Sequence, residues 1–444
     1  MNTQRESAPA AVPPEWAKQA GEARPIKEWA EPSVWTDKML ETLDTGVKGG
    51  KWFSLVDKVW GMGNLQSAFL SVERNDGACG VDNISVHKFG RDLDKQLERL
   101  QKELREGSYR PRPARRKWID KPGSDKKRPL GIPTVRDRVV ETALKHVLEP
   151  IFEHGFSENS HGFRPGRSCK SALAQVESLM DEGKLTVLEV DIQGFFDHID
   201  HGKLLGLVSD KVSDGRVLSL VRLMLERGVL DEGRLYETQE GTPQGGVISP
   251  LLANIYLDGL DHLVEGAGQR MVRYADDFVI LCRDTVEAES CLAMVTRWCG
   301  DMGLSVHPDK SGTVDMSEAG NHFVFLGYKY HRSVKTGNLN RYPSAKACWK
   351  LRYRLSPYLK RTNGCSMETI VKMVNPILRG WFNYFLESPP WSLDGMSGWV
   401  RMRLRSILRK RRKGKGRGRG KDHQRWPNAY FAKLGLHTIP KVSP

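Results

Sequence analysis

The chain has 444 residues, a length that corresponds to about two or three domains of roughly 100–200 residues each. Its 69 Lys and Arg against 54 Asp and Glu give a formal net charge of +15, which favours a polyanionic partner such as a nucleic acid. The sequence has neither an apolar stretch of about 18 residues nor a signal-peptide core, so we expect neither membrane insertion nor secretion. Its 7 cysteines form no CxxC pair, and we expect reduced thiols in a cytoplasmic protein.

The N-terminal segment, residues 1–33, is rich in Ala, Pro and Glu and is predicted to be flexible. Trp16 and Trp29 within it are candidates for docking on a partner. Helical periodicity then appears in 34–50 and again in 88–107, which ends in Gly as a helix C-cap does.

A β-hairpin is predicted for residues 116–133, "RKWIDKPGSDKKRPLGIP", with its tip at 122–127. Residues 110–128 carry 9 Lys and Arg against two Asp, so the hairpin is strongly cationic. An amphipathic helix is expected to follow over 137–153.

The middle of the chain predicts further strands and helices. "LTVLEVDI", residues 185–192, has the continuous apolar run of a buried strand, with Asp191 at its C-terminal end. Residues 249–264 show helical spacing, and "MVRYADDFVILC", residues 271–282, predicts a strand, a tight turn and a second strand. A helix over 286–302 and strands over 304–307 and 323–331 complete a mixed α/β region.

From Ala345 onward the periodicity is helical and the charge is basic, over residues 346–361, 367–387 and 398–413. Residues 401–425 hold 13 basic residues and one acid, Asp422. This stretch starts as a helix and ends as a Gly-interleaved basic segment, which we expect to form no core.

The adjacent carboxylates of Asp276 and Asp277 lie between two apolar runs, where like charges repel unless a cation lies between them and other acids. Asp191 supplies a third carboxylate if the two segments are neighbouring strands. Oxygen ligands without His or Cys favour Mg²⁺ over zinc. The alternatives are a solvated Asp-Asp turn and, for Asp191, a helix N-cap.

Tyr274-Ala275-Asp276-Asp277 resembles the catalytic tetrapeptide of reverse transcriptases. Further blocks resemble, in the same order along the chain, those of bacterial group II intron reverse transcriptase/maturases. These blocks are "NDGACGVDNIS" (75–85), "RPLGIPTVRDRVVETAL" (128–144), "SHGFRPGRSCKSAL" (160–173), "DIQGFFDHI" (191–199), "GTPQGGVISPLLANIYLD" (241–258), "GLSVHPDKSG" (303–312), "FVFLGYKY" (323–330), "NPILRGWFNYF" (375–385) and "RWPNAYFAKLGL" (425–436).

The resemblance implies an α/β right-hand polymerase, with fingers and palm, followed by an all-α thumb/maturase region. The implied activity is RNA-directed DNA polymerase, together with a maturase function in intron splicing and retrohoming. We expect a flexible extension at 1–33, an N-terminal extension and fingers at 34–185, a palm at 186–340, a thumb at 341–400 and a basic nucleic-acid-binding segment at 401–444.

In this family a primer 3′-hydroxyl attacks the α-phosphate of a dNTP with the help of two Mg²⁺ ions, for which Mn²⁺ is a possible substitute. The resemblance assigns catalysis and metal binding to Asp191, Asp276 and Asp277. It also assigns substrate contacts: triphosphate binding to Lys121 and Arg128, exclusion of a 2′-hydroxyl to Phe196, the nucleotide pocket to Gln244 and protonation of the leaving pyrophosphate to Lys310. An extra residue between Lys121 and Arg128 departs from the commonest family spacing. From the residues alone, each assignment has an alternative. Lys121 and Arg128 could belong to a generic basic hairpin and Phe196 to the core. The glycines after Gln244 could form an ordinary turn, and Lys310 could be a surface lysine.

The expected partners are group II intron RNA, an RNA template with a DNA or RNA primer, dNTPs and target DNA, in the bacterial cytoplasm or nucleoid. The aromatic cluster at 381–385 is predicted to be thumb core. The residues expected to bind nucleic acid are Lys350, Arg352, Arg354, Lys360, Arg361, Arg409, Lys410, Arg411, Arg412 and Lys413.

The chain stops at Pro444 without paired cysteines, so we expect no DNA endonuclease domain, as in the shorter group IIC-like lineage. Three alternatives remain at this stage: a reverse transcriptase freed from its intron and used in defence or repair, a non-catalytic RNA-binding splicing factor, and a retron-type enzyme.

Overall fold

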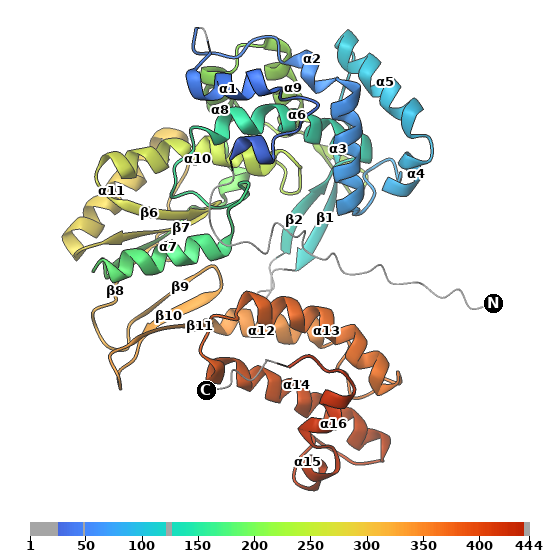
Figure 1. Ribbon diagram of the computed structural model, residues 1–444, viewed down its shortest axis with the longest axis vertical. Helices are drawn as coiled ribbons and strands as arrows, with labels where there is room; N and C mark the ends of the chain where they lie inside the picture. Colours follow the sequence, from blue (N-terminus) through green and yellow to red (C-terminus); the bar gives the residue numbers. More distant parts are fainter. Residues whose placement is uncertain (1–24, 48, 121–126, 439–444) are drawn as a thin grey trace. The chain divides into compact units, whose positions relative to one another are not determined.

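The computed structural model describes residues 25–47, 49–120 and 127–438, and the predicted hairpin tip and Lys121 lie outside them. The described residues form two compact units, divided between Asp315 and Met316. The first is mixed α/β and the second begins with a small sheet and is otherwise helical (Figure 1). Within the described part of the chain, every helix is too short or too polar to span a lipid bilayer. The division into fingers, palm and thumb stays a prediction.

Helices form the N-terminal part of the first unit. Their most buried member, α6, presents Val139, Val140, Leu144 and Val147 to the core, as the amphipathic pattern predicts. Gly107 ends α5 in the left-handed conformation, which confirms the predicted C-cap. The predicted continuous helix over 88–107 is instead two helices, separated after Gly90. The bounds are α1 Asp37–Thr45, α2 Val56–Val59, α3 Met62–Asn75, α4 Val86–Gly90, α5 Leu93–Glu106 and α6 Val135–Glu153.

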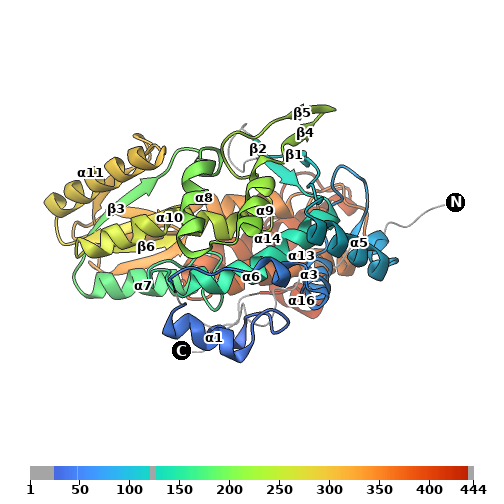
Figure 2. The same ribbon diagram turned by 90° about the horizontal axis from the view of Figure 1, so that it is seen from above.

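The predicted hairpin exists, with strands β1 (Ala114–Asp120) and β2 (Lys127–Ile132) in antiparallel register. Two short strands that the sequence did not predict, β4 (Val229–Asp231) and β5 (Arg234–Tyr236), extend this sheet in the order β2-β1-β4-β5 (Figure 2).

The central sheet has the order β6-β7-β3-β8, and all its neighbours are antiparallel. Alternate residues face opposite sides of such a sheet. Leu188, Val190 and Ile280 belong to the large core that contains α10 and α11, whereas α7 covers the other face (Figure 1). The bounds are β3 Thr186–Asp191, β6 Arg270–Tyr274, β7 Asp277–Cys282, β8 Gly312–Asp315, α7 Cys169–Asp181, α8 His201–Lys211, α9 Gly215–Glu226, α10 Ser249–Gly266 and α11 Thr285–Met302.

Two predicted strands are wrong in detail. Residues 304–307 make only an isolated bridge, Ile192 with Val306, because they follow a helix end and pair with the chain after β3 for two residues. Residues 323–331 are a hairpin rather than one strand, since Leu326 and Gly327 adopt positive φ values of 48° and 83°. Its strands, β9 (His322–Phe325) and β10 (Tyr328–Arg332), continue into β11 (Leu339–Pro343).

The second unit ends in helices α12 (Ala345–Leu355), α13 (Met367–Tyr384), α14 (Pro390–Arg411), α15 (Lys421–Arg425) and α16 (Asn428–Lys433). Phe382 and Phe385 are buried, which confirms that this aromatic cluster is core. Hydrogen bonds attach the small sheet to α13: the Tyr328 hydroxyl donates to the Tyr384 carbonyl (2.6 Å), and the Tyr384 hydroxyl to the Leu326 carbonyl (2.7 Å).

The expectation that 401–425 forms no core is wrong. Arg405 is buried, its Nε donates to the Trp426 carbonyl (2.8 Å), and its guanidinium lies 5.2 Å from the Phe431 ring centroid. Arg409 Nη1 pairs with the buried carboxylate of Asp422 at 2.5 Å. The basic composition gave no indication of this core, because arginine side chains can pack on aromatic rings while hydrogen bonds and ion pairs satisfy their charged groups.

Candidate active site

The register of the central sheet brings the three predicted acids to one end of it. Asp191, the last residue of β3, is the direct partner of Asp277, the first residue of β7. Asp276 occupies the preceding turn, where Ala275 has a φ of 59°. This tight turn lets neighbouring acids reach one end of the sheet, as the sequence predicted. Asp191 caps no helix, because the short helix at 195–197 has Gly194 at its N-cap.

The pKa of Asp276 responds to two of the other predicted site residues, Arg128 and Asp191. Burial raises the pKa of its carboxyl above the ordinary value, the nearby Arg128 guanidinium lowers it, and the Asp191 carboxylate raises it. Arg128 and Asp191 therefore both lie within electrostatic range of Asp276, although they are distant in sequence.

Asp191 also has a cation beside it. Lys310 Nζ lies 3.0 Å from Asp191 Oδ2 and donates a hydrogen bond to it. The loop that carries Lys310 is attached to the end of β3, since the His307 amide donates to the Asp191 carbonyl (2.8 Å) and the Asp191 amide to Ser311 Oγ (3.1 Å). These bonds hold the loop with Lys310 at the end of β3, although the two segments are more than about a hundred residues apart in the sequence.

The three predicted acids are candidate ligands for a divalent metal ion. Among the described residues, no group of three or more His, Cys, Asp or Glu side chains already has the arrangement of a metal centre. The donor chemistry nevertheless suits a hard divalent cation, because the carboxylates of Asp191, Asp276 and Asp277 offer oxygen ligands at one end of the sheet.

The β1–β2 hairpin contacts the "PQGG" loop (residues 243–246) directly. The Gly131 amide of β2 donates to the Gln244 carbonyl (2.8 Å). Gly245 has a φ of 117°, and a Cβ there would collide with the Gly131 carbonyl, so only glycine fits. Gln244 therefore lies beside β2, the strand that also carries Arg128 three residues before Gly131.

Phe196 lies in a short 3-10 helix after β3 and is half-buried against Phe195, with ring centroids 5.2 Å apart. Its carbonyl accepts from the Thr242 amide (2.8 Å). The backbone of Phe196 and the loop that carries Gln244 are therefore held together.

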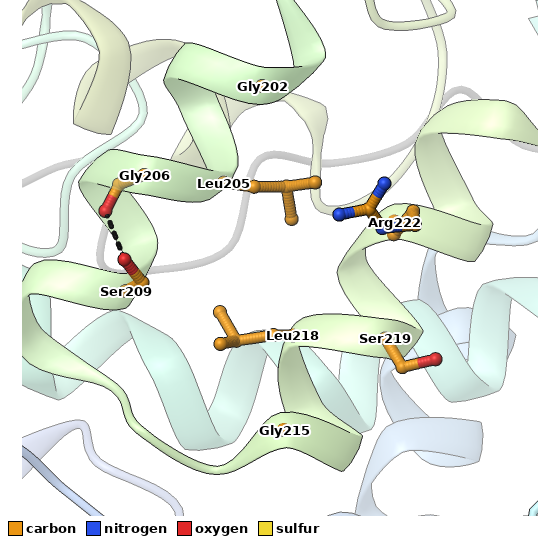
Figure 3. A pocket seen from close by; sticks show the side chains of 8 residues that line it. All are labelled: Gly202, Leu205, Gly206, Ser209, Gly215, Leu218, Ser219 and Arg222. Atoms are coloured by element: carbon orange, nitrogen blue, oxygen red, sulfur yellow. Dashed lines mark hydrogen bonds between the residues drawn. The ribbon is translucent and has the colours of Figure 1, made fainter.

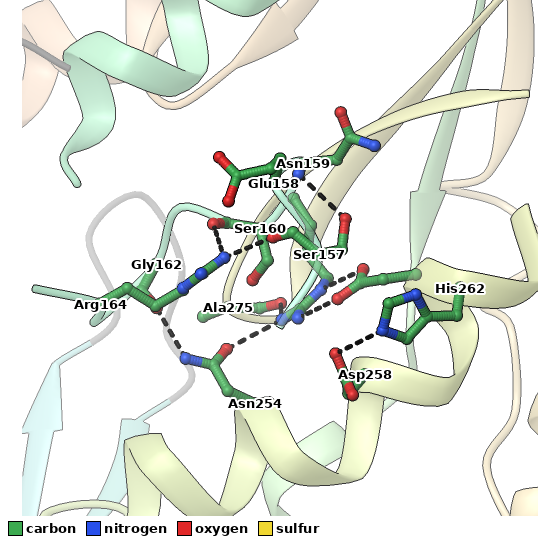
Figure 4. A network of polar contacts seen from close by, with 12 residues as sticks. Ser157, Glu158, Asn159, Ser160, Gly162, Arg164, Asn254, Asp258, His262 and Ala275 are labelled. Carbon is green, nitrogen blue, oxygen red and sulfur yellow. Dashed lines mark hydrogen bonds and ion pairs between the residues drawn. The ribbon is translucent and has the colours of Figure 1, made fainter. Parts of the chain in front are cut away.

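Sequence reasoning missed the polar network beneath the turn that carries Ala275 and Asp276 (Figure 4). Arg273 is fully buried, and its guanidinium donates to both Asp261 oxygens (2.7 and 2.5 Å), to Asn254 Oδ1 (2.9 Å) and to the Ala275 carbonyl (3.0 Å). Asn254 in turn donates to the Gly162 carbonyl (2.8 Å). An arginine within the apolar strand was the only available signal.

A second buried pair holds the "PQGG" loop. Arg227 and Glu141 form an ion pair with side chains 1% and 0% exposed. Glu141 Oε2 also accepts from the Val247 amide at 2.5 Å. Sequence reasoning missed both residues, because each lies in a helix-like pattern where a solvated charge is the ordinary expectation.

A shallow cavity of about 450 Å³ lies between α8 and α9, lined by Leu205, Leu218 and Arg222 among others (Figure 3). It contains none of the predicted site residues. The candidate active site is therefore the end of the central sheet and not this cavity.

The residues predicted to bind nucleic acid divide into two groups in the second unit. Arg361 Nη2 donates to the Gly414 carbonyl (3.2 Å), Arg409 pairs with Asp422, and Arg411 donates to the Cys365 carbonyl, so these three contribute to the fold. Arg411 is nevertheless exposed, as are all the others: Lys350, Arg352, Arg354, Lys360, Lys410, Arg412 and Lys413. A role of either group in binding stays a prediction.

Comparisons with known proteins agree with this architecture. The family model "Reverse transcriptase (RNA-dependent DNA polymerase)" matches residues 119–330, and "Group II intron, maturase-specific domain" matches residues 348–426. Protein YkfC of Escherichia coli is 34% identical over 295 residues, which cover 57% of this chain and 76% of YkfC. The group II intron-encoded protein LtrA of Lactococcus lactis is 43% identical over 199 residues, which cover 44% of this chain and 33% of LtrA.

The chain belongs to the reverse transcriptase family. Its C-terminal part carries the maturase-specific domain of group II intron proteins. The predicted fold class is thereby confirmed. A telomerase structure from Candida albicans superimposes with a TM-score of 0.43 at 12% identity, covering 80% of this chain and 69% of that one. Since this score is below 0.5, the assignment rests on the sequence matches.

Proposed function

We propose that the protein is an RNA-directed DNA polymerase that copies RNA into DNA with dNTPs and two Mg²⁺ ions. The observation that carries this proposal is the grouping of Asp191, Asp276, Arg128 and Lys310 around the end of one sheet. Carboxylates by themselves occur in many turns. Carboxylates beside cations that can bind a triphosphate are what nucleotidyl transfer requires.

Asp191 and Asp276 would hold the ions, with Asp277 as the third acid. Bound Mg²⁺ supplies charge neutralisation for the attacking hydroxyl and the leaving pyrophosphate, and Mn²⁺ is a possible substitute. Arg128, and Lys121 outside the described residues, would bind the triphosphate of the dNTP.

The remaining residues would select and release the nucleotide. Gln244 would line the nucleotide pocket, and the Phe196 ring would exclude a ribose 2′-hydroxyl by steric contact. The Lys310 ammonium, 3.0 Å from Asp191, lies within reach of the same site and would donate a proton to the leaving pyrophosphate.

The second unit would bind group II intron RNA and so assist splicing and retrohoming into target DNA, in the cytoplasm. The maturase-specific match and the exposed cations of α12 and of residues 410–413 support this part. Cations that contact phosphate provide affinity without sequence readout, so recognition of one intron would depend on RNA shape.

A primer-extension assay on an RNA template, with a DNA or RNA primer, tests the proposal. We expect dNTP- and Mg²⁺-dependent extension by the wild type, loss on adding a chelator and recovery with Mg²⁺. Asp191→Asn should reduce extension about 1000-fold or more, since a metal ligand is removed. Extension by Asp191→Asn at the wild-type rate would refute the site, and binding of RNA without any extension would favour a non-catalytic splicing factor.

A further inference from the structure

Phe163 is a large aromatic residue that the sequence analysis gave no role. Its side chain is 52% exposed, and its ring centroid lies 6.0 Å from that of Tyr274, the first residue of the catalytic tetrapeptide. An exposed phenylalanine beside the predicted active site offers a planar apolar surface of the kind on which nucleotides pack.

The backbone at Phe163 is in a conformation that phenylalanine disfavours. Its φ is 58°, in the left-handed region, where a bulky side chain is uncommon. The preceding Gly162 is packed so tightly that a Cβ there would collide with the Ala275 amide nitrogen. A strained residue at such a point persists only when its surroundings fix it, and such residues gather at functional sites.

The surroundings do fix it, on both sides. Before Phe163, the His161 amide donates to the Arg273 carbonyl (2.8 Å), and the Gly162 carbonyl accepts from Asn254 (2.8 Å). After it, the buried Arg164 donates to the Ser160 carbonyl (2.7 Å), as Figure 4 shows. Arg164 also donates to Glu153 (2.9 Å). The Phe163 loop is therefore attached to the same polar network that supports the turn at Ala275 and Asp276.

The order of strands shows on which side of the acids Phe163 lies. Ser160 bridges to Arg273 in parallel, so the Phe163 loop extends the sheet beyond β6, whereas Asp191 and Phe196 follow β3 two strands away. Phe196 is the proposed contact of the incoming nucleotide. Phe163 flanks the acids from the opposite side, where the other reactant would lie.

We propose that Phe163 is a positioning residue that packs against the primer–template duplex next to the primer's 3′ terminus. This inference rests on the proposed polymerase function. The ring contacts apolar sugar and base surface, and the strained, anchored backbone keeps it in place before the substrate binds, which lowers the entropy lost on binding.

The variant Phe163→Gly removes the aromatic ring without straining the backbone, so it tests the role of the ring apart from the stability of the fold. Glycine adopts a φ of 58° without steric cost, so the melting temperature should not fall below that of Phe163→Ala. We expect Phe163→Gly to raise the KM for primer–template about tenfold, an effect typical of losing one aromatic contact to a nucleotide. The KM for dNTP and the dNTP/rNTP ratio should stay within about twofold, and Phe163→Tyr should retain wild-type values.

Phe53→Gly is the matched control, since Phe53 is an exposed phenylalanine on another loop of the same unit, near Asp214. It should leave the KM for primer–template unchanged. If the wild type extends a primer and Phe163→Gly has the wild-type KM for primer–template, this inference fails while the proposed function stands. If Phe163→Gly changes only the dNTP/rNTP ratio, the ring contacts the nucleotide and the proposal is wrong. A wild type without extension activity would refute the proposed function itself.

Discussion

The two compact units differ in where most of the charged side chains of interest lie. In the α/β unit, Arg273 with Asp261 and Arg227 with Glu141 are buried ion pairs that carry further hydrogen bonds, to the Ala275–Asp276 turn and to the "PQGG" loop. In the helical unit, most cations on α12 and at 410–413 are exposed. The first arrangement fixes geometry, and the second offers charge to a partner.

The difference follows from what each proposed task requires. Catalysis needs groups held in one geometry, and a buried pair with every hydrogen bond satisfied can hold a turn rigidly. Binding of a long polyanion needs many exposed cations, each of small individual effect. Loss of a buried charge should therefore damage stability, whereas loss of exposed charges should change only affinity.

The largest expected effect is on Arg273. Arg273→Ala leaves the buried Asp261 carboxylate without its partner, a change that costs about 3–5 kcal/mol of unfolding free energy. Arg283→Ala, an exposed arginine on the same hairpin, should change it by no more than about 0.5 kcal/mol. Chemical denaturation of both variants measures the difference, and equal effects would contradict a structural role for the buried pair.

Phe196 tests the substrate side of the α/β unit. Phe196→Ala should raise rNTP incorporation about tenfold or more relative to dNTP, because the proposed exclusion of the 2′-hydroxyl is steric. Single-nucleotide extension with each nucleotide gives the ratio. An unchanged ratio would show that the half-buried ring is simply part of the core.

The exposed cations of the second unit should act on affinity. Replacing Lys410, Arg412 and Lys413 by Ala should weaken RNA binding and lower the slope of log K against log salt by about 2–3, at roughly 0.7–0.9 per lost phosphate contact. Removing three exposed lysines of the first unit, Lys38, Lys95 and Lys102, subtracts the same charge. If the slope of log K against log salt falls equally in both triple variants, RNA binding depends on net charge and not on residues 410–413 in particular.

The smallest expected effect concerns the ion pair that folds the basic segment. The hydrogen bond from Arg409 lowers the pKa of Asp422 below its ordinary value. A carboxyl with a lowered folded pKa stabilises the protein above its unfolded pKa, and this stabilisation is lost as pH falls through the folded value. Asp422→Asn should therefore melt a few degrees lower than the wild type at pH 7, and the difference should shrink as the pH falls below the ordinary aspartate pKa of about 3.9 and the carboxyl becomes protonated. A difference that persists at low pH would assign the effect to packing.

The hairpin around the acids was predictable because local sequence determines it. Apolar residues on both sides of Asp276 favour two strands, and the short interval between them allows only a tight turn. Asp191 at the end of a buried run then becomes the neighbour of Asp277 as soon as the two strands pair.

What could not be predicted depends on partners distant in sequence. Arg273 reads as a polar residue in an alternating strand, and Asp261 as the solvated face of a helix, until the fold buries both. The positive φ of Phe163 leaves no trace in composition or periodicity. In the same way, the packing of Arg405 against Phe431 made a core from a segment whose charge predicted none.

The most direct test of the central claim measures two quantities on the same proteins: the dissociation constant for intron RNA and the single-turnover extension rate at saturating primer–template. Asp276→Asn should lose about 1000-fold or more in rate with an RNA affinity within about twofold of wild type. The variant with Lys410, Arg412 and Lys413 replaced by Ala should show the reverse, weaker RNA binding with an unchanged rate. If Asp276→Asn extends at the wild-type rate, or if both variants lose rate and affinity together, chemistry and RNA binding are not divided between the two units as we propose.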